Sequence, residues 1–440
     1  MVKEINVGLI GFGTIGGGLV NQFIEQKPSG INLETVVEKD LSKHRKSVFY
    51  SMATEADDVI NNPDIDIIVE LIGGYHPARE YIINALENGK HVVTANKALI
   101  SKYGPEIFET AKRNKVNIGF EAAVGGGIEI INSILDGQLS HENITGIVGI
   151  LNGTTNFILT NMSKSILQRE KPMTYDAALK MAKEAGFAES DPSFDVEGKD
   201  AAQKISILAS LAFGTYINPD DVYTEGITEI TPTDFESAEE LNPGYTIKLL
   251  AMAKKTEHGV DLRVHPALIR KSHQLANIEN EFNAVYIEGT YLGSEYRSAK
   301  GAGREATSLS VYTDIVKIAN MMRTGIHRPI NMKTDSIQIA DQNKIITRGY
   351  LRMNLKDVPV ALYEALGIIS KKYKWNLKDS IQSANNEFSV EGKTYIPDII
   401  THSPLEFGIV KQTLEDLTKL SQKENGPIYG KPFYMRIYDR

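Results

Sequence analysis

A glycine-rich segment near the N-terminus constrains the fold of this chain more than any other feature. Residues 3–16 read KEINVGLIGFGTIG, an apolar run that closes on a GxGxxG pattern and leads into a helical pattern. A strand, a glycine turn and a helix in that order are typical of a dinucleotide-binding fold, because glycines let backbone amides approach a pyrophosphate. A tight glycine turn without a ligand is the alternative. The residues expected beside the phosphates are Gly11, Phe12, Gly13, Thr14, Ile15 and Gly16.

The end of the next predicted strand bears on which dinucleotide is bound. The strand over residues 32–37 is followed by Glu38 and Lys39, and then by three basic residues at 43–45. In such folds an acidic group at this position holds the ribose 2′-hydroxyl of NAD, whereas a basic group accepts the 2′-phosphate of NADP. Both kinds of group are present, so the residues alone leave NAD and NADP open.

Composition narrows the class of protein. A chain of 440 residues should form two or three domains, and 42% hydrophobic with 24% charged residues is ordinary for a globular protein. The net charge of −8 argues against nucleic acid or an anionic membrane as the main partner. With no cysteine, the chain can form no disulfide, thiolate zinc site or covalent thiol intermediate. No apolar run is long enough to span a membrane and the N-terminus leads straight into a strand, so we expect a cytoplasmic protein.

A charged segment in the middle of the chain runs into an apolar helix. Residues 186–204 read GFAESDPSFDVEGKDAAQK, and the helix predicted over 205–214 has no charged residue, which is typical of a buried helix. Asp200 and Lys204 lie one helical turn apart, so they are either charges at the entrance of the interior or an ordinary exposed ion pair. Pro192 keeps the preceding loop extended. The groups expected to converge on one cavity, suited to a small zwitterion, are Glu189, Asp195, Asp200 and Lys204.

A lysine follows another predicted strand. Residues 91–95 form the strand, and Asn96 and Lys97 lie at its carboxyl end. Because open parallel sheets bind ligands at this edge, Lys97 is a candidate site residue, and the alternative is a solvated surface charge.

Two small-residue turns are further candidates. Gly125, Gly126 and Gly127 allow backbone carbonyls to converge, and together with Glu121 they could form an all-oxygen cation site or simply a turn. The turn at 153–156, GTTN, either approaches a substrate carboxylate with its small hydroxyl residues or caps a helix.

The run from Ala182 to Lys204 resembles the signature segment of the homoserine dehydrogenase family. Its glycine, Asp-Pro, acidic and lysine positions keep every spacing of that signature, which is far more specific than a short glycine motif. VTANKALI at 93–100 and GTTN at 153–156 resemble further segments, and the resemblance covers nearly the whole chain. It implies an NAD(P)-dependent oxidoreductase that interconverts L-aspartate 4-semialdehyde and L-homoserine in threonine, methionine and isoleucine biosynthesis.

The resemblance also implies roles for individual residues. The position matching Lys204 donates the proton and the one matching Lys97 faces the nicotinamide and the substrate, so the implied catalytic residues are Lys204, Lys97 and Asp200. The implied substrate-binding residues are Glu189, Asp195, Asp200, Gly153, Thr154 and Thr155. Beyond the glycine turn, the implied cofactor contacts are Lys39, Thr94, Lys97, Gly186 and Gly303. The family often has an arginine at Lys39, which keeps the charge and favours NADP, with NAD still open.

A cation site is implied as well. In the family a monovalent cation, Na⁺ or K⁺, is bound through the positions matching Glu121, Val124, Gly126 and Ile128. Its role would be structural rather than redox.

The expected α/β architecture has three parts. A Rossmann-type dinucleotide-binding domain spans 1–135 with a returning segment at 303–340, and an α+β substrate and dimerisation domain spans 136–302. Residues 345–440 predict a ferredoxin-like βαββαβ module that resembles an ACT domain. ACT domains usually follow their first strand with a glycine that admits an effector, and Val360 stands there instead. Effector binding is therefore open, while a homodimer or homotetramer is expected.

A non-catalytic sensor is the rival interpretation. Such a protein would bind dinucleotide and an amino acid without turnover, but intact Lys204, Asp200 and Lys97 argue against it. Aspartate-semialdehyde dehydrogenase is excluded, because that enzyme requires a cysteine nucleophile.

Overall fold

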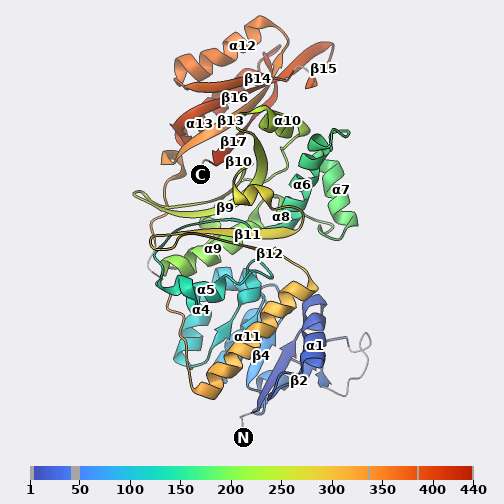
Figure 1. Cartoon of the computed structure of the whole chain (residues 1–440), viewed down its shortest axis with the longest axis vertical. Coiled ribbons are helices and arrows are strands. Elements are labelled where there is room, and N and C mark those ends of the chain that lie inside the picture. Colours follow the sequence, from blue (N-terminus) through green and yellow to red (C-terminus); the bar gives the residue numbers. More distant parts are fainter. Residues whose placement is uncertain (1–3, 41–49, 335–336, 384–385, 439–440) are drawn as a thin grey trace. The chain divides into compact units, whose positions relative to one another are not determined.

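The computed structural model describes residues 4–40, 50–334, 337–383 and 386–438 (Figure 1). The basic residues at 43–45 lie outside these ranges. Among the described helices, none has both the length and the apolar character that crossing a membrane requires.

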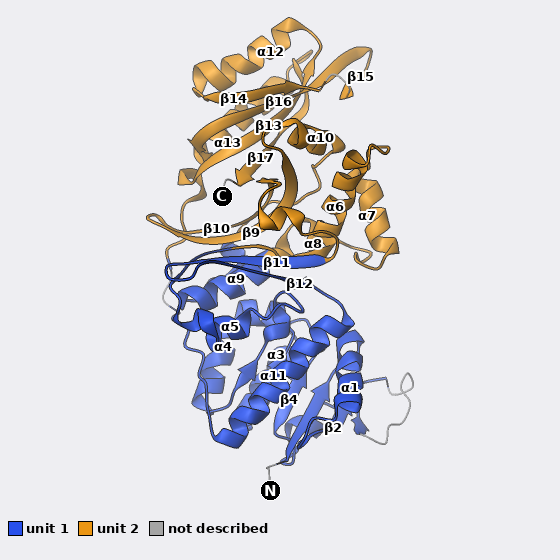
Figure 2. Cartoon of the chain, viewed as in Figure 1, with its two compact units in different colours: residues 1–147, 202–222, 282–337 blue, residues 148–201, 223–281, 338–440 orange. Residues whose placement is uncertain are grey.

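The chain divides into two compact units, each built from three segments (Figure 2). Unit 1 comprises residues 1–147, 202–222 and 282–337. Unit 2 comprises residues 148–201, 223–281 and 338–440. The chain passes from one unit to the other within β7 (Ile144–Ile150) and within α9 (Lys199–Phe213). The expected three-part domain division stays a prediction.

Unit 1 contains a six-stranded sheet in which every neighbouring pair is parallel. Its order is β3-β2-β1-β4-β5-β6, the doubly wound order of dinucleotide-binding domains. The strands are β1 (Ile5–Ile10), β2 (Ile31–Val37), β3 (Ser51–Ala53), β4 (Ile67–Glu70), β5 (His91–Thr94) and β6 (Ile118–Gly119). The Rossmann-type fold predicted from the glycine turn is confirmed.

Helices pack on this sheet. The helices that follow its strands are α1 (Thr14–Gln26), α2 (Asp57–Ile60), α3 (Ala78–Glu87) and α4 (Lys97–Arg113). The long helix α11 (Arg304–Thr324) returns the chain to the sheet and packs beside α1, where Phe23 meets Tyr312 edge to face (Figure 1). Val311 and Ile315 of α11 join strand residues such as Leu9 in one buried cluster, so the returning segment completes the core.

The rest of unit 1 is a short helical region and a hairpin. The turns and helices are η2 (Glu121–Ala123), α5 (Ile131–Leu135), η3 (Gln138–His141) and η4 (Pro219–Asp221). β11 (Phe282–Gly289) and β12 (Gly293–Lys300) pair as an antiparallel hairpin just before α11.

The first part of unit 2, before the C-terminal elements, contains four helices and a long hairpin. The helices are α6 (Gly153–Leu167), α7 (Tyr175–Glu184), α8 (Ser193–Val196) and, later, α10 (Pro232–Glu240). β9 (Tyr245–Thr256) and β10 (Gly259–Arg270) pair antiparallel over their whole length, with β8 (Tyr223–Thr224) beside β10 and η5 (Gln274–Asn277) after it.

The C-terminal elements have the predicted βαββαβ order. They are β13 (Ile346–Lys356), α12 (Pro359–Leu366), β14 (Leu377–Gln382), β15 (Phe388–Val390), β16 (Lys393–Glu406), α13 (Phe407–Ser421) and β17 (Ile428–Tyr438). β15 is a short addition paired to β16, and a π-helical turn, Gly367–Lys372, continues α12. The strand order β17-β13-β16-β14 is antiparallel and ferredoxin-like.

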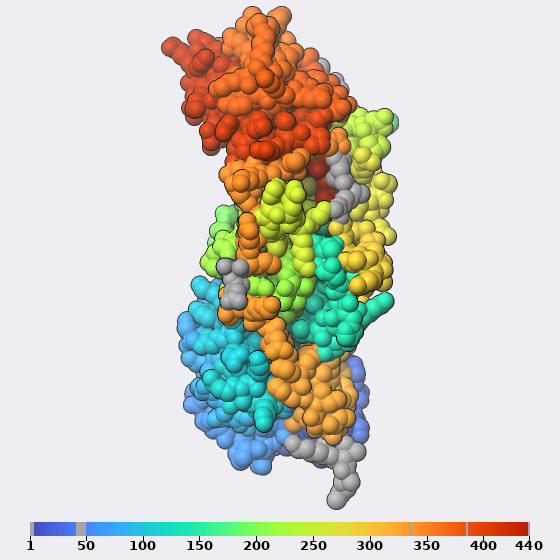
Figure 3. All heavy atoms as spheres, turned by 90° about the vertical axis from the view of Figure 1, so that its left-hand side faces the viewer, coloured from blue at the N-terminus to red at the C-terminus, as the bar shows by residue number. Residues whose placement is uncertain are grey.

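This module is not isolated within unit 2. β17 pairs in parallel with β10, so the sheet continues from the hairpin into the C-terminal strands. Trp375, Ile400 and Val410 belong to its buried core, which α12 and α13 cover. In the space-filling view the deep orange and red residues of this module lie together (Figure 3).

Candidate active site

The glycine turn of unit 1 has the geometry of a phosphate site. Gly11 has a φ of 102°, and a Cβ on Gly16 would lie 2.1 Å from the Gly11 carbonyl oxygen, so a side chain at residue 16 would clash. Gly13 is the N-cap of α1, which has no side-chain cap and no acidic residue in its first turn. The unsatisfied amides and positive end of the helix dipole are thus available to an anion.

A cavity of about 310 Å³ lies beside this turn, at the carboxyl ends of β1 and β2. Glu38 and Lys39 both line it. The Glu38 carboxylate also accepts a hydrogen bond from the Phe12 amide at 3.3 Å, which ties the end of β2 to the glycine turn. The remaining lining residues are Ile10, Gly11, Val37, Thr54, Ala56, Ile72, Gly73, His76, Pro77 and Tyr81. The acidic and the basic candidate for recognition of the ribose therefore lie in the same cavity.

A buried carboxylate accepts hydrogen bonds from the turns that follow β4 and β5. Glu70 at the end of β4 is fully buried and accepts hydrogen bonds from the amides of Ile72 at 2.8 Å and Gly73 at 3.1 Å. Its other oxygen accepts the Thr94 hydroxyl at 2.7 Å, and that hydroxyl in turn accepts the Asn96 amide. Thr94 thus has a structural role in holding the turn, besides the cofactor contact predicted for it.

Lys97 follows directly from this arrangement. Asn96 caps α4 by accepting the Leu99 amide at 3.1 Å, and its own amide group donates to Gly74 O. Lys97 is the first residue of α4, half-buried, at the carboxyl end of β5. The structure therefore places it at the sheet edge where parallel sheets bind ligands.

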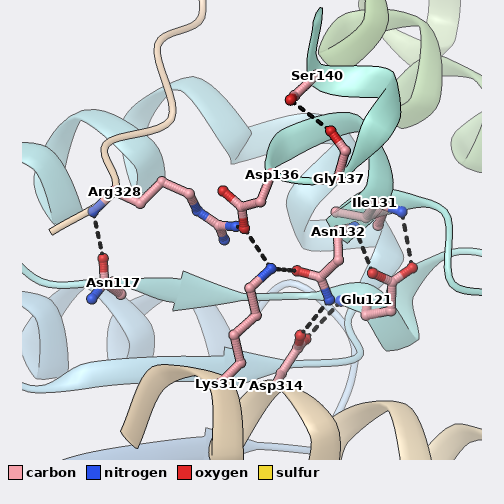
Figure 4. Close-up of polar contacts among 10 residues, drawn as sticks. All are labelled: Asn117, Glu121, Ile131, Asn132, Asp136, Gly137, Ser140, Asp314, Lys317 and Arg328. Atoms are coloured by element: carbon pink, nitrogen blue, oxygen red, sulfur yellow. Dashed lines mark hydrogen bonds and ion pairs between the residues drawn. The ribbon is translucent and has the colours of Figure 1, made fainter. Parts of the chain in front are cut away.

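The Glu121 side chain does not point outward as a ready ligand. Its carboxylate accepts the amides of Ile130, Ile131 and Asn132 at 2.6, 2.9 and 2.6 Å, which satisfies the N-terminus of α5 (Figure 4). Burial raises the pKa of Glu121 to about 7, with these hydrogen bonds acting in the opposite direction. Asp314 of α11 holds the same turn, accepting the Glu121 amide at 2.8 Å and the Asn132 side chain at 2.9 Å.

Charged side chains lie next to Glu121 and Asp314. Lys317 donates to the Asn132 side-chain oxygen at 2.6 Å and pairs with Asp136, which also pairs with Arg328 (Figure 4). Within the described part of the chain, no group of three or more histidine and acidic side chains is arranged to hold a metal ion. A cation at the glycine run would therefore need backbone oxygens among its ligands.

The backbone of the glycine run is compatible with that role. Gly125 and Gly126 have φ values of 73° and 56°, which turn successive carbonyls sharply. A Cβ on Gly126 would lie 2.6 Å from Gly301 O and 3.0 Å from Lys300 O, so the turn runs against two further carbonyls. The Ser310 hydroxyl donates to Gly126 O at 2.7 Å, which leaves one lone pair of that oxygen.

The acidic candidates of unit 2 meet around the first turn of α6. The side-chain amide of Asn152 donates to Asp195 at 2.8 Å and to Asp200 at 2.9 Å. The Thr154 hydroxyl lies 2.7 Å from Phe187 O and 3.0 Å from Asp195 Oδ2, so it can donate to either. Asp195 and Asp200, predicted from the sequence to converge, are thus brought together.

The remaining candidates in unit 2 are Gly153, Thr155, Gly186 and Glu189. Gly153 begins α6, and a Cβ there would lie 2.9 Å from Glu281 O. The Thr155 hydroxyl faces Asn152, and Gly186 turns the chain after α7 with a φ of 76°. Glu189 is exposed and makes no hydrogen bond or ion pair within the described ranges.

The two charges on α9 are not an exposed ion pair. Asp200 is 4% and Lys204 9% exposed, so the interpretation as charges entering the interior is the one that fits. Gly303, the N-cap of α11, has a φ of 115° and open space where a Cβ would be. Lys97, Lys204 and Gly303 belong to unit 1 and the acidic cluster to unit 2, so their convergence on one substrate stays a prediction.

Two residues of the site were not found by sequence reasoning. Glu70 and Asn152 each hold several candidate segments by hydrogen bonds. An acidic residue at the end of a buried parallel strand, and an asparagine before a helix, are signals that could have identified them.

Together, a doubly wound parallel sheet, a glycine turn at a helix N-terminus and an acidic cluster that includes buried Asp200 are typical of a dinucleotide-dependent oxidoreductase acting on a small polar molecule. Comparisons with known proteins name the family. The family model for homoserine dehydrogenase matches residues 130–316, and the model for the NAD-binding domain of homoserine dehydrogenase matches residues 11–121.

Relatives match over nearly the whole length. A homoserine dehydrogenase of Pseudomonas aeruginosa is 38% identical over 92% of this chain and 93% of its own, and one of Bacillus subtilis is 36% identical over 94% and 96%. The crystal structure of a homoserine dehydrogenase from Thiobacillus denitrificans has a TM-score of 0.87 at 34% identity, covering 99% of both chains. A hyperthermophilic archaeal homoserine dehydrogenase in complex with NADPH has a TM-score of 0.60 at 28% identity, covering 72% of this chain and 98% of its own.

The chain belongs to the homoserine dehydrogenase family. It is an NAD(P)-dependent oxidoreductase that interconverts L-aspartate 4-semialdehyde and L-homoserine. This assignment favours the enzyme over the non-catalytic sensor.

Proposed function

We propose that the acidic cluster of unit 2 holds the substrate and that Lys204 exchanges the proton. During reduction of the semialdehyde, a reduced nicotinamide cofactor held by unit 1 would supply the hydride to the aldehyde carbon. The aldehyde oxygen then develops negative charge and needs a proton, which a lysine ammonium can give. Lys204 is suited to this task because it is buried on α9, one turn from Asp200.

The observation that carries the proposal is the convergence of two carboxylates on one buried amide. Asp195 and Asp200 come from separate helices, yet both contact Asn152, and exposed Glu189 lies on the loop before them. Three carboxylates along one short segment suit the ammonium group of an amino acid. In this proposal Gly153, Thr154 and Thr155 would contact the substrate, and Lys97 would act at its reacting end.

The proposal extends to the cofactor. Lys39 is the group that would face the 2′-phosphate of NADP, and Glu38 in the same cavity would accept the 2′-hydroxyl of NAD. We expect NADP to be preferred and NAD to be accepted, with the glycine turn, Thr94, Gly186 and Gly303 as further contacts.

A monovalent cation, Na⁺ or K⁺, is a further part of the proposal. Its ligands would be main-chain oxygens of Glu121, Val124, Gly126 and Ile128, because the Glu121 carboxylate is already used by α5. The cation would stabilise the turn rather than take part in redox chemistry.

The remaining parts of the proposal rest on the family resemblance. They are a role in threonine, methionine and isoleucine biosynthesis, a cytoplasmic location, assembly as a homodimer or homotetramer, and an ACT-like role for the C-terminal module. That module's ferredoxin-like strand order supports the last of these.

A substrate analogue tests the proposed substrate site. 4-Hydroxybutyrate keeps the reacting hydroxyl and the carboxylate of homoserine but lacks the ammonium. If the acidic cluster binds the ammonium, nicotinamide reduction with this analogue should have a kcat/KM at least about 100-fold lower than with homoserine. Similar values for the two alcohols would contradict the proposed role of the cluster.

A further inference from the structure

Asn152 has an unusual set of contacts for a helix N-cap. It precedes α6 with extended backbone, φ −126° and ψ 117°, and its side chain is buried, with the residue 4% exposed. Its Oδ1 accepts the Thr155 amide at 2.8 Å and the Thr155 hydroxyl at 2.9 Å. Because the oxygen is used on the helix side, the amide nitrogen must face the other way.

Both N–H groups of that nitrogen donate to carboxylates. Asp195 Oδ1 of α8 lies 2.8 Å away and Asp200 Oδ2 of α9 lies 2.9 Å away. Two carboxylates that share one nitrogen repel each other, and donors to their charged forms offset that repulsion. One neutral side chain thus contacts two acids that are separate in the sequence.

The first turn of α6 is itself anchored. The Asn156 side chain donates to Ile278 O at 3.1 Å and Asn280 O at 3.0 Å, and buried Lys248 donates to Asn156 Oδ1 at 3.0 Å. Asn152 therefore connects the acids to a fixed part of unit 2.

We propose that Asn152 is a positioning residue that holds Asp195 and Asp200 in the geometry required to bind the substrate. This role rests on the proposed assignment of the two acids to the substrate. It goes beyond a capping function, because the cap uses only Oδ1.

The two functions of Asn152 can be separated by substitution. Asn152→Asp keeps the shape and a good N-cap, but it removes both donors and adds a third carboxylate. We expect it to raise the KM for homoserine by about 10- to 100-fold, the loss expected for hydrogen bonds to charged groups, with the KM for the cofactor unchanged. Asn152→Ser keeps the cap and one donor, so its KM should lie between those of Asn152→Asp and the unmodified enzyme.

Thr174→Ala is the matched control. Thr174 caps α7 by accepting the Ala177 amide at 3.3 Å and does not contact the acids. Its loss should lower the melting temperature and leave the KM for homoserine unchanged.

A second variant links the effect to direct contact. The added carboxylate of Asn152→Asp should lower the melting temperature, because it repels Asp195. The double variant Asn152→Asp/Asp195→Asn again places one amide opposite one carboxylate, so it should recover part of the lost melting temperature. If the change in melting temperature of the double variant equals the sum of the changes in the two single variants, direct contact between residues 152 and 195 is contradicted.

These experiments distinguish the positioning role of Asn152 from the assignment of Asp195 and Asp200 to substrate binding. Asp195→Asn alone tests that assignment, and an unchanged KM for homoserine would overturn both. If Asp195→Asn raises the KM while Asn152→Asp behaves like the unmodified enzyme, the acids bind substrate but Asn152 only caps α6, and the positioning role is wrong.

Discussion

Replacing Glu70 by glutamine should loosen the cofactor side of the active site. The carboxylate is fully buried and accepts three hydrogen bonds, from the amides of Ile72 and Gly73 and from the Thr94 hydroxyl. In Glu70→Gln the amide oxygen can keep the two backbone donors. The amide nitrogen then faces the Thr94 hydroxyl, whose proton loses its acceptor.

The size of the effect follows from these contacts. A hydrogen bond to a charged group contributes about 1.5–3 kcal/mol and a neutral one about 0.5–1.5, so three weakened bonds cost roughly 3 kcal/mol. Removing a buried charge returns part of its desolvation cost. We therefore expect a net loss of about 2 kcal/mol, or about 4–8 °C in the melting temperature of a unit this size.

Function should change in the same variant. Gly73 lines the cavity beside the glycine turn and Thr94 precedes Lys97, so a looser turn should raise the KM for the cofactor several-fold. Differential scanning fluorimetry and initial rates measure the two effects. Glu106→Gln is the control, because Glu106 is an exposed partner of Arg79 in the same unit and such pairs contribute about 0–1 kcal/mol. A Glu70→Gln enzyme that matches this control in melting temperature and cofactor KM would refute the reasoning.

Four further predictions concern the proposed site and the C-terminal module. Lys204→Ala should lower kcat at least about 100-fold with cofactor affinity nearly unchanged, and an enzyme that keeps most of its turnover would remove Lys204 as proton donor. Glu189→Gln should raise the KM for homoserine by about 10- to 100-fold with little change in kcat, whereas an unchanged KM would make Glu189 structural. Lys39→Ala should raise the KM for NADP and leave the KM for NAD unchanged, because Lys39 is the basic group of the cavity. Glu38→Gln removes the acidic group and should therefore increase the preference for NADP over NAD. A variant that changes the KM values of both cofactors equally would contradict these roles. L-Threonine at millimolar levels should inhibit the enzyme weakly or not at all, because Val360, 60% exposed, stands where an ACT domain has glycine. If threonine inhibits the unmodified enzyme as strongly as it inhibits Val360→Gly, the Val360 side chain does not limit threonine binding.

Glu121 shows that a candidate residue chosen from the sequence can have contacts that the sequence does not indicate. The sequence singled out Glu121 because a carboxylate beside a glycine run resembles an oxygen-ligand site. In the folded protein that carboxylate accepts three amides at the start of α5, and its orientation is set by that helix. The difference depends on where α5 begins in space, which no local pattern specifies.

The sequence by itself determined the parts of this protein that depend on short-range order. The GxGxxG turn predicted the Rossmann-type sheet, because only glycine permits the approach of Gly16 to the Gly11 carbonyl. The alternation of apolar strands and helices after Tyr350 predicted the βαββαβ order, because strand and helix periodicities differ along the chain.

Tertiary structure decided which side chains are hydrogen-bonded to these candidate residues. Asn152 lies 43 and 48 residues from the acids that it holds, and Glu70 lies 24 residues from Thr94. Such hydrogen bonds are made only where separate elements pack, and they leave no periodic signal in either segment. Buried polar groups must nevertheless find partners, since an unpaired one costs about 1–3 kcal/mol, and packing therefore selected Asn152 and Glu70 as the residues around which the candidate site is arranged.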